Sequence, residues 1–302
     1  MRQQTIVTLT EGSVRGLLSI ARYRFLSATQ FARVTGFSLY HSREVLRRFA
    51  NRKLLGSLGF SGIPGAGRTP KIYFLTKKGF EILWQEIDSP EALGTFQAVN
   101  PDISWSPKMY HRIALVDLFT SLEAAVQPRP AIVLIQTFLE YRRIGPSLAR
   151  ETTDYVGEAQ TSLDRIVPDG AFILENREKG TRGLFFVEMD MGTERISAPK
   201  SADISATIVG KFLAYDRYLT SGRFAATYAP FGKFSAATIL LVTTSAFRVE
   251  HMRQAAVRLP PELHGYYRIS VQDQALADFL GPIWKSRDPT DTVLHSLVGR
   301  GA

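Results

Sequence analysis

Cysteine is absent from this chain of 302 residues. Its absence excludes disulfide bonds, thiolate metal ligands and a cysteine nucleophile, and it is typical of cytoplasmic proteins. Long apolar runs are missing too. No stretch reaches the roughly 18 residues that a membrane-spanning helix needs, and the residues after Met1 lack the apolar segment of a signal peptide. We therefore expect a cytoplasmic protein without a membrane partner.

Acidic residues are scarce at the start of the chain. Residues 1–80 hold 14 Lys and Arg but only two acids, Glu11 and Glu44, which leaves a net charge of +12. The rest of the chain holds 23 basic and 26 acidic residues. A compact basic segment joined to a nearly neutral body is typical of a nucleic-acid-binding module.

The basic segment has the signals of a helix-turn-helix. Apolar spacing predicts a helix over 13–22 with Ser13 as its N-cap, and a short helix after Ser27, a second N-cap candidate. Residues 36–38 (Gly-Phe-Ser) break the pattern, as the turn requires, and a third helix is expected over 39–51.

Two strands follow in the pattern of a wing. A strand begins at 54–55, a glycine-rich loop covers 56–67, a returning strand covers 71–75, and a last helix is expected over 80–87. The first domain is therefore predicted to be a winged helix-turn-helix spanning 1–88.

The third helix is the candidate recognition helix, whose N-terminal residues would reach base edges in the major groove. Winged helices also bind proteins, but the charge of the segment favours double-stranded DNA as the partner. The predicted DNA-binding residues are Tyr40, His41, Arg43, Arg47, Arg48, Arg52, Lys53, Arg68 and Lys71.

Breaker residues over 89–107 indicate a linker, and residues 108–302 are predicted to form a second domain. Its helices and strands are expected in the order α-β-β-β-α-β-α-β-α, a mixed sheet flanked by helices, with a polar insertion over 145–163. The whole chain is therefore predicted to be α/β (α+β).

This order matches the core of the restriction-endonuclease-like, PD-(D/E)xK nucleases. Asp169 follows Pro168 near the second strand, and Glu188 ends the third, across a hairpin. Two neighbouring carboxylates repel each other, and a divalent cation between them relieves the repulsion. The pair therefore predicts Mg²⁺ or Mn²⁺ as the cofactor if the domain is a nuclease. No other cofactor is expected.

The lysine of that motif is missing, because Asp190 stands two residues after Glu188. A migrated lysine could replace it, and Lys211 on the following helix is preferred over Lys200. The predicted catalytic set, if the domain is active, is Asp169, Glu188, Asp190 and Lys211. The predicted metal ligands are Asp169, Glu188 and, as a further candidate, Glu123; His111 and Glu140 could also contribute. The alternative is purely structural: a turn aspartate, an edge strand and a surface lysine. Tyr215 and Tyr218 could be strand-transfer nucleophiles, but their helical spacing favours packing.

The chain also resembles the replication-relaxation family of plasmids and integrative elements. The matching segments are residues 75–79 (Leu-Thr-Lys-Lys-Gly), His111, Pro168-Asp169-Gly170, residues 185–194 and residues 211–215. The resemblance implies a DNA-binding accessory role in replication, relaxation or transfer, with a nuclease-like second domain that is degenerate. It also implies a relaxase or replication protein as a partner. Met191 stands where the family tends to have a basic residue.

Three alternatives remain open beside this accessory role: a metal-dependent DNA endonuclease or nickase, a winged-helix transcriptional regulator, and a protein-interaction adaptor for a relaxase. A homodimer is compatible with each.

Overall fold

A computed structural model describes residues 9–60, 69–100, 106–144, 149–161, 164–198 and 204–298. The chain divides into two compact units, Met1–Ala124 and Ala125–Ala302. The expected linker falls within the first unit, so the domain boundaries 1–88, 89–107 and 108–302 stay a prediction. In the described part of the chain, every helix is too short or too polar to cross a bilayer.

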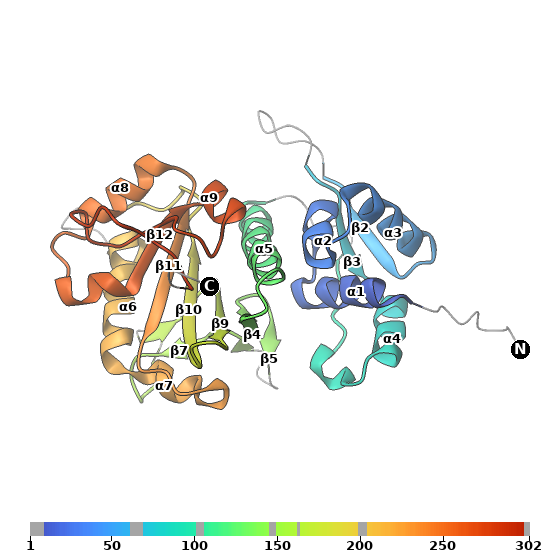
Figure 1. Cartoon of the computed structure of the whole chain (residues 1–302), viewed down its shortest axis with the longest axis horizontal. Helices are drawn as coiled ribbons and strands as arrows, with labels where there is room; N and C mark the ends of the chain where they lie inside the picture. Colours follow the sequence, from blue (N-terminus) through green and yellow to red (C-terminus); the bar gives the residue numbers. More distant parts are fainter. Residues whose placement is uncertain are drawn as a thin grey trace, which may run out of the picture. The chain divides into compact units, whose positions relative to one another are not determined.

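The first unit is mainly helical (Figure 1). Its elements are α1 (Glu11–Tyr23), β1 (Leu26–Ser27), α2 (Ala28–Thr35), α3 (Leu39–Asn51), β2 (Leu55–Leu58), β3 (Ile72–Leu75), α4 (Lys77–Glu86), η1 (Pro90–Leu93) and most of α5 (Pro107–Val126).

Side-chain caps fix where these helices begin. Thr10 accepts a hydrogen bond from the amide of Ser13 and is therefore the N-cap of α1, which corrects the expected cap at Ser13. Ser27 caps α2 as predicted, in a capping box with Gln30. Gly36 ends α2 in the left-handed conformation (φ 72°), which a residue without Cβ adopts at little cost.

The topology of the first unit is that of a winged helix-turn-helix. Helix α3 has the expected bounds, 39–51, and follows α2 after a three-residue turn. Strands β2 and β3 pair antiparallel, and the order in the sheet is β1-β3-β2. The N-terminal part of the fold prediction is thus confirmed. The tip of the wing, 61–68, lies outside the described residues.

The second unit is built on a mixed sheet. Its strands are β4 (Ile132–Leu139), β5 (Arg143–Ile144), β6 (Ala149–Arg150), β7 (Asp154–Tyr155), β8 (Arg165–Ile166), β9 (Gly170–Asn176), β10 (Thr181–Met189), β11 (Ala237–Thr243), β12 (Tyr267–Val271), β13 (Trp284–Lys285) and β14 (Leu294–His295). Its helices are η2 (Ile204–Ala206), α6 (Ile208–Ser221), α7 (Arg223–Thr227), η3 (Ala229–Phe231), α8 (Ala246–Ala255), η4 (Pro261–Tyr266) and α9 (Gln272–Ala277).

The large sheet has seven strands in the order β14-β13-β12-β11-β10-β9-β4. Strands β4, β9 and β10 form an antiparallel meander, whereas β10, β11 and β12 run parallel because α6 and α8 provide the crossovers. The expected mixed sheet with flanking helices is therefore confirmed.

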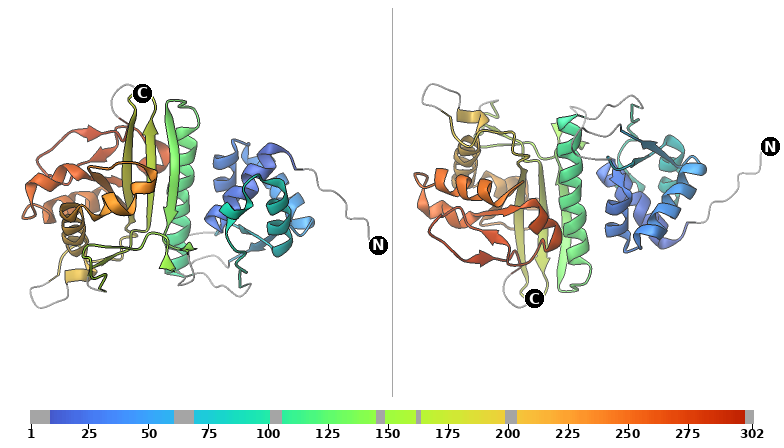
Figure 2. Two further views of the ribbon diagram at one scale, coloured as in Figure 1. Left: turned by 90° about the horizontal axis from the view of Figure 1, so that it is seen from below. Right: turned by 90° about the horizontal axis from the view of Figure 1, so that it is seen from above.

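Each face of this sheet has its own cover (Figure 2). On one face, side chains of α6, α7 and α8 pack against β9, β10 and β11 in a single apolar core that includes Phe186, Phe212 and Met252. On the other face, the stacked rings of Phe172 and Phe185 meet the segment that follows α9. Because α6 connects β10 to the parallel strand β11, it packs on the sheet beside β10, whose C-terminal end carries Glu188.

Candidate functional site

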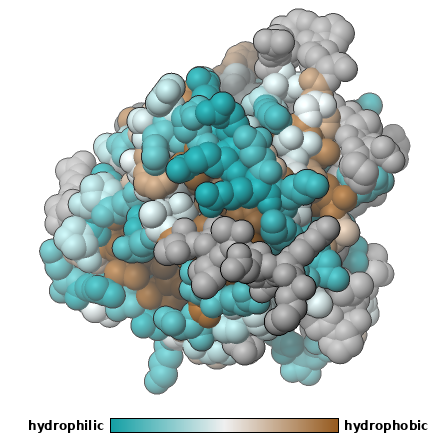
Figure 3. All heavy atoms as spheres, turned by 90° about the vertical axis from the view of Figure 1, so that its right-hand side faces the viewer, coloured by the Kyte–Doolittle hydropathy of each residue, from teal (hydrophilic) through white to brown (hydrophobic). Residues whose placement is uncertain are grey.

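Helix α3 has a buried side and an exposed side. Ser42, Val45, Leu46 and Phe49 are buried against the first unit. The exposed residues are Leu39, Tyr40, His41, Arg43, Arg47, Arg48 and Asn51. Figure 3 faces the side of Figure 1 on which α3 is drawn, and hydrophilic residues form a broad patch there. The predicted contacts on α3 are therefore on the surface.

The single acid of α3 is already paired. A carboxylate oxygen of Glu44 lies 2.6 Å from a guanidinium nitrogen of Arg47. Arg43 and Arg48 have no carboxylate partner among the residues that the structure describes. The exposed side of α3 is thus positive.

The structure brings the wing strand and the recognition helix together at Tyr73. The Lys71 ammonium lies over the Tyr73 ring, 5.7 Å from its centroid. Burial raises the pKa of Tyr73, and the nearby positive charge of Arg43 acts in the opposite direction. Lys71 and Arg43 therefore belong to one basic surface, although 28 positions separate them in the sequence.

Two further predicted residues lie at the end of α3. Arg52 and Lys53 are exposed, and Lys53 has a positive φ of 59° in the tight connection to β2. The carbonyl of Arg52 accepts a hydrogen bond from Lys78, which fixes this connection to α4. Arg68 lies outside the described residues.

The second candidate site is a cluster of charged residues on the second unit. Asp169 directly precedes β9, and the pairing of Gly170 with Val187 sets it opposite Glu188 on β10. An oxygen of Asp169 accepts a hydrogen bond of 2.8 Å from the amide of Met189. The predicted neighbouring carboxylates are therefore adjacent in the structure.

Helix α6 contributes the cation of this cluster. The ammonium of Lys211 lies 3.0 Å from Glu188 Oε2 and 2.9 Å from Glu194 Oε1. The hydroxyl of Tyr215, one turn further on, donates a 2.6 Å hydrogen bond to Glu188 Oε1. Both oxygens of Glu188 are thus held by α6.

Burial dominates the electrostatics of Glu188, which is only 6% exposed. Loss of hydration raises its pKa to about 7, the Lys211 charge lowers it, and the Asp169 charge raises it. Burial lowers the pKa of Lys211, but the ion pairs with Glu188 and Glu194 outweigh this effect, so that its pKa is raised overall.

Asp190 has different partners from those of the cluster. It is 2% exposed and accepts hydrogen bonds from Thr243, at 2.6 Å, and from the guanidinium of Arg248 through both carboxylate oxygens. Arg248 also donates to the carbonyl of Glu194. The side chain of Asp190 thus ties the loop after β10 to α8, and its place in a catalytic set stays a prediction.

Sequence reasoning missed three residues of this network. Glu194 is the last residue of the segment 185–194 that carries the family resemblance, and this segment was the available signal. Tyr215 was interpreted as packing, and Arg248 carried no signal because it lies 58 positions beyond Asp190. Tyr215 and Tyr218 are both buried, and burial raises the pKa of each hydroxyl, which makes them poor nucleophiles.

Other acidic candidates are paired elsewhere. Glu123, on α5, lies 2.6 Å from Arg22 and accepts a 2.6 Å hydrogen bond from Tyr23, all within the first unit. Glu140 pairs with Arg150. Among the residues that the structure describes, no group of three or more His, Asp or Glu side chains is arranged to hold a metal ion. Lys200 lies outside those residues.

Asp169 and Glu188 carry the type of ligand that Mg²⁺ prefers, since this ion is commonly bound by one or two carboxylates, with waters and substrate phosphates completing the shell. In the structure, however, both oxygens of Glu188 are bound by Lys211 and Tyr215, and one oxygen of Asp169 is bound by the amide of Met189. Mg²⁺ or Mn²⁺ at these two residues therefore stays a prediction.

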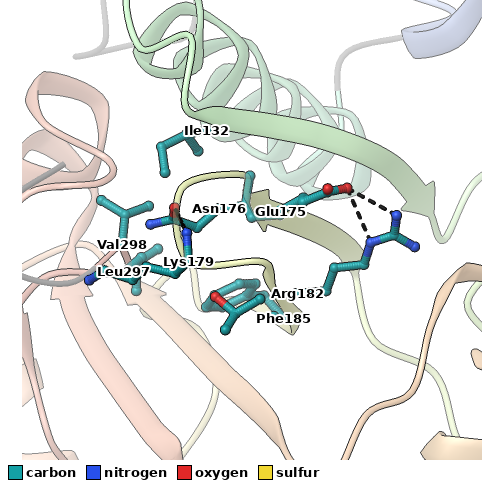
Figure 4. A pocket seen from close by; sticks show the side chains of 11 residues that line it. Ile132, Glu175, Asn176, Lys179, Arg182, Phe185, Leu297 and Val298 are labelled. Carbon is teal, nitrogen blue, oxygen red and sulfur yellow. Dashed lines mark hydrogen bonds and ion pairs between the residues drawn. The ribbon is translucent and has the colours of Figure 1, made fainter.

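A pocket of about 290 Å³ lies at the opposite end of the same strands (Figure 4). Asn176, Lys179 and Thr181 of the hairpin line it, and the ion pair between Glu175 and Arg182 stands at its side. Strand β9 runs between this hairpin and Asp169, a separation of about 20 Å at the usual rise per residue. The pocket is therefore distinct from the carboxylate cluster.

Fold and sites together define a two-unit protein with an N-terminal winged helix-turn-helix and a charged cluster on a mixed sheet. The sequence profile described as replication-relaxation matches residues 17–233, more than half of the chain. The chain therefore belongs to the replication-relaxation family, as its motifs predicted. A search of curated proteins finds no significant match.

Several solved structures are similar to short parts of the chain. A point mutant of MarR from E. coli, complexed with operator DNA, is 17% identical over 28% of this chain and 61% of its own, with a TM-score of 0.23. BpsR of Bordetella bronchiseptica is 26% identical over 40% of this chain and 85% of its own, with a TM-score of 0.24. The chain thus spans about three fifths of the MarR structure. The winged-helix assignment rests on the topology described above.

Proposed function

We propose that this protein binds double-stranded DNA sequence-specifically through α3 and the wing. Its role would be that of an accessory protein in the replication, relaxation or transfer of a plasmid or integrative element. The observation that carries the proposal is the exposed face of α3, on which Tyr40, Arg43, Arg47 and Arg48 all lie. Membership of the replication-relaxation family supports the biological setting.

Charge supports duplex DNA over a protein partner. The net charge of +12 over residues 1–80 would release counterions from a phosphate backbone, which drives binding. Arg43 and Lys71 flank Tyr73 on one surface, so helix and wing strand would contact the same duplex.

The test is a binding titration of the full-length protein with DNA from the region around its own gene. Arg43→Ala together with Arg47→Ala is expected to weaken binding at least tenfold, since each good base or phosphate contact contributes about 1–3 kcal/mol. The matched control is Arg217→Ala with Arg258→Ala, which removes the same charge from exposed positions of the second unit. Equal affinities of both double variants and the wild type would refute the assignment of α3.

The second unit is proposed to have a restriction-endonuclease-like fold. The antiparallel meander β4-β9-β10, the crossover α6 and the parallel strand β11 follow the core order of that fold. The proposal is supported by the adjacent positions of Asp169 and Glu188 and by the contact of Lys211, a cation on the helix instead of the strand, with Glu188. The expectation of a degenerate site rests on Asp190, which stands where that lysine is normally found.

A metal-dependent endonuclease or nickase is the second candidate function, favoured by the 3.0 Å contact between Lys211 and Glu188. A bound Mg²⁺ would activate water and stabilise charge on the scissile phosphate. Tyr215 and Lys211 fix the position of the Glu188 carboxylate, and the Lys211 ammonium would neutralise phosphate charge.

Supercoiled plasmid incubated with the protein and Mg²⁺, Mn²⁺ or a chelator separates these candidates. An active site predicts nicking that needs metal, disappears in Glu188→Ala and persists in Glu175→Ala, a carboxylate on β9 outside the cluster. A band shift without cleavage under every condition predicts a DNA-binding scaffold. Protection of its own promoter without any metal dependence would instead favour the transcriptional regulator.

A further inference from the structure

The exposed side of α3 has one row of residues along its centre. Tyr40, Glu44, Arg47 and Asn51 follow at spacings of four, three and four, which places them on one side of a helix. The buried residues Ser42, Val45, Leu46 and Phe49 lie on the opposite side. Tyr40 therefore stands at the N-terminal end of the row that faces away from the first unit.

Two apolar side chains are exposed in the first turn of this helix. Tyr40 is 77% exposed and its neighbour Leu39 is 38% exposed. Single exposed apolar residues are common on protein surfaces. Whether Leu39 and Tyr40 have a binding role therefore depends on where they lie on the helix. In a winged helix the first turn of the recognition helix enters the major groove and meets base edges.

The first turn is also held in a defined conformation. The Ser38 side chain caps the helix by accepting a hydrogen bond from the amide of His41. The His41 ring packs edge-on against Phe37, with 4.6 Å between ring centroids. Leu39 and Tyr40 therefore project from an ordered turn, which lowers the entropic cost of a contact made there.

The side chains that read adenine by hydrogen bonding are absent from this part of the helix. Residues 39–46 contain no Asn or Gln, which pair bidentately with adenine in the major groove. The apolar group that an A·T pair presents in that groove is the C5-methyl of thymine. Leu39 and Tyr40 have the matching chemistry.

We propose that Leu39 and Tyr40 form a thymine-methyl reading site, so that the DNA target carries thymines opposite the first turn of α3. This inference rests on the proposed function, because it needs α3 to enter a major groove. It adds a residue, Leu39, that charge and polarity did not single out. Arg43, one turn further along, would fix the register by a contact to guanine or phosphate.

The experiment compares one duplex with and without the methyl groups. Full-length protein first enriches 30-bp duplexes from a random pool, and the enriched duplex is then made with thymine or with uracil, which lacks only the methyl. Burial of one methyl contributes about fourfold to affinity. Two contacts therefore predict that wild-type protein binds the thymine duplex about fifteenfold more tightly than the uracil duplex.

Four variants test which residues cause the thymine preference. Tyr40→Phe keeps the ring and should keep the preference, whereas Tyr40→Ala and Leu39→Ala should each reduce the ratio toward one. Arg43→Ala should weaken binding to both duplexes and leave the ratio unchanged. Because Tyr40 is exposed, its replacement should leave the helix content, measured by circular dichroism, unchanged.

The failures of the two proposals are distinguishable. If no duplex is enriched, specific DNA binding itself is refuted, and this inference falls with it. If a duplex is enriched but binds equally with thymine and uracil, DNA binding stands and the methyl-reading site is refuted. A thymine preference that is undiminished in both Tyr40→Ala and Leu39→Ala would also refute the assignment to these residues.

Discussion

Helix α3 of the first unit and the charged cluster of the second unit differ in how their charged side chains are paired. On α3, the cations Arg43 and Arg48 are exposed, and the single nearby acid, Glu44, is paired with Arg47. In the second unit, Lys211 forms ion pairs with Glu188 and Glu194, and Arg248 forms an ion pair with the buried Asp190. The first arrangement leaves positive charge for another molecule, whereas the second neutralises charge within the protein.

This difference predicts which charged residues contribute to DNA binding and which contribute to the stability of the fold. An exposed cation is solvated and loses little when it exchanges water for a phosphate. A buried ion pair has already lost its hydration, and removal of one partner leaves an uncompensated charge. Substitutions in the second unit should therefore affect stability first, and substitutions on α3 should affect DNA affinity first.

The largest effect is expected at the most deeply buried ion pair. Arg287 is 0% exposed, and it lies 2.8 Å and 3.0 Å from the two oxygens of Asp216, which also accepts a hydrogen bond from Tyr267. Arg287→Met should lower the free energy of unfolding by about 3–5 kcal/mol, because Asp216 stays buried without its countercharge. Urea denaturation followed by circular dichroism measures the change.

The control is the matching exposed pair. Arg47→Met breaks the contact with Glu44 but should change the free energy of unfolding by less than about 1 kcal/mol. A double variant, Arg287→Met with Asp216→Leu, should recover most of the lost stability. Similar losses for Arg287→Met and Arg47→Met would contradict the contrast between buried and exposed charge.

A smaller, pH-dependent effect is expected at Glu188. Burial raises its pKa to about 7 from 4.5, so the folded state binds the proton more tightly than the unfolded state. Its stabilising contribution is therefore full below pH 4.5 and is lost as the pH rises through about 7. The loss amounts to about 3 kcal/mol at the usual value per pKa unit.

Glu188→Gln cannot titrate and removes this dependence. The measurement is the unfolding free energy of wild type minus that of Glu188→Gln from about pH 4 to about pH 8. The difference should fall with rising pH and level off above about pH 7. A difference that rises over this range would show that the folded state prefers the ionised carboxylate.

The smallest effect is expected from the acid on α3. Glu44→Gln removes the one negative charge of the helix and should tighten DNA binding about threefold at low salt, with less effect at high salt. Glu11→Gln on α1 removes the other acid of the first eighty residues and serves as the matched control. A larger gain from Glu11→Gln would move the DNA-binding surface away from α3.

Local signals explain how much of this could be predicted. The bounds of α3 followed from the break at residues 36–38 and from the spacing of Val45, Leu46 and Phe49, because both signals are local to this helix. The cap of α1 was placed at Ser13 instead of Thr10 because two hydroxyl residues precede the same apolar pattern. Neighbouring carboxylates were foreseen because a hairpin connects Asp169 and Glu188.

Long-range partners could not be predicted in the same way. Arg248 meets Asp190 and Arg287 meets Asp216 only after the crossovers of the sheet are formed. No periodicity links residues that lie 58 or 71 positions apart. Tyr215 was interpreted as packing because its helical spacing with Tyr218 is typical of a core, and the hydrogen bond to Glu188 depends on how α6 covers β10.

The most direct test of the central claim is the salt dependence of DNA binding by wild type and by Arg48→Ala with Arg52→Ala. If these exposed arginines contact phosphates, the slope of log affinity against log salt should become shallower by about 1.8, at about 0.9 per lost contact. Arg217→Ala with Arg258→Ala, which removes two exposed cations of the second unit, should leave the slope unchanged. An unchanged slope in the Arg48→Ala with Arg52→Ala variant, or an equal decrease in the control variant, would contradict the assignment of the DNA-binding surface to α3.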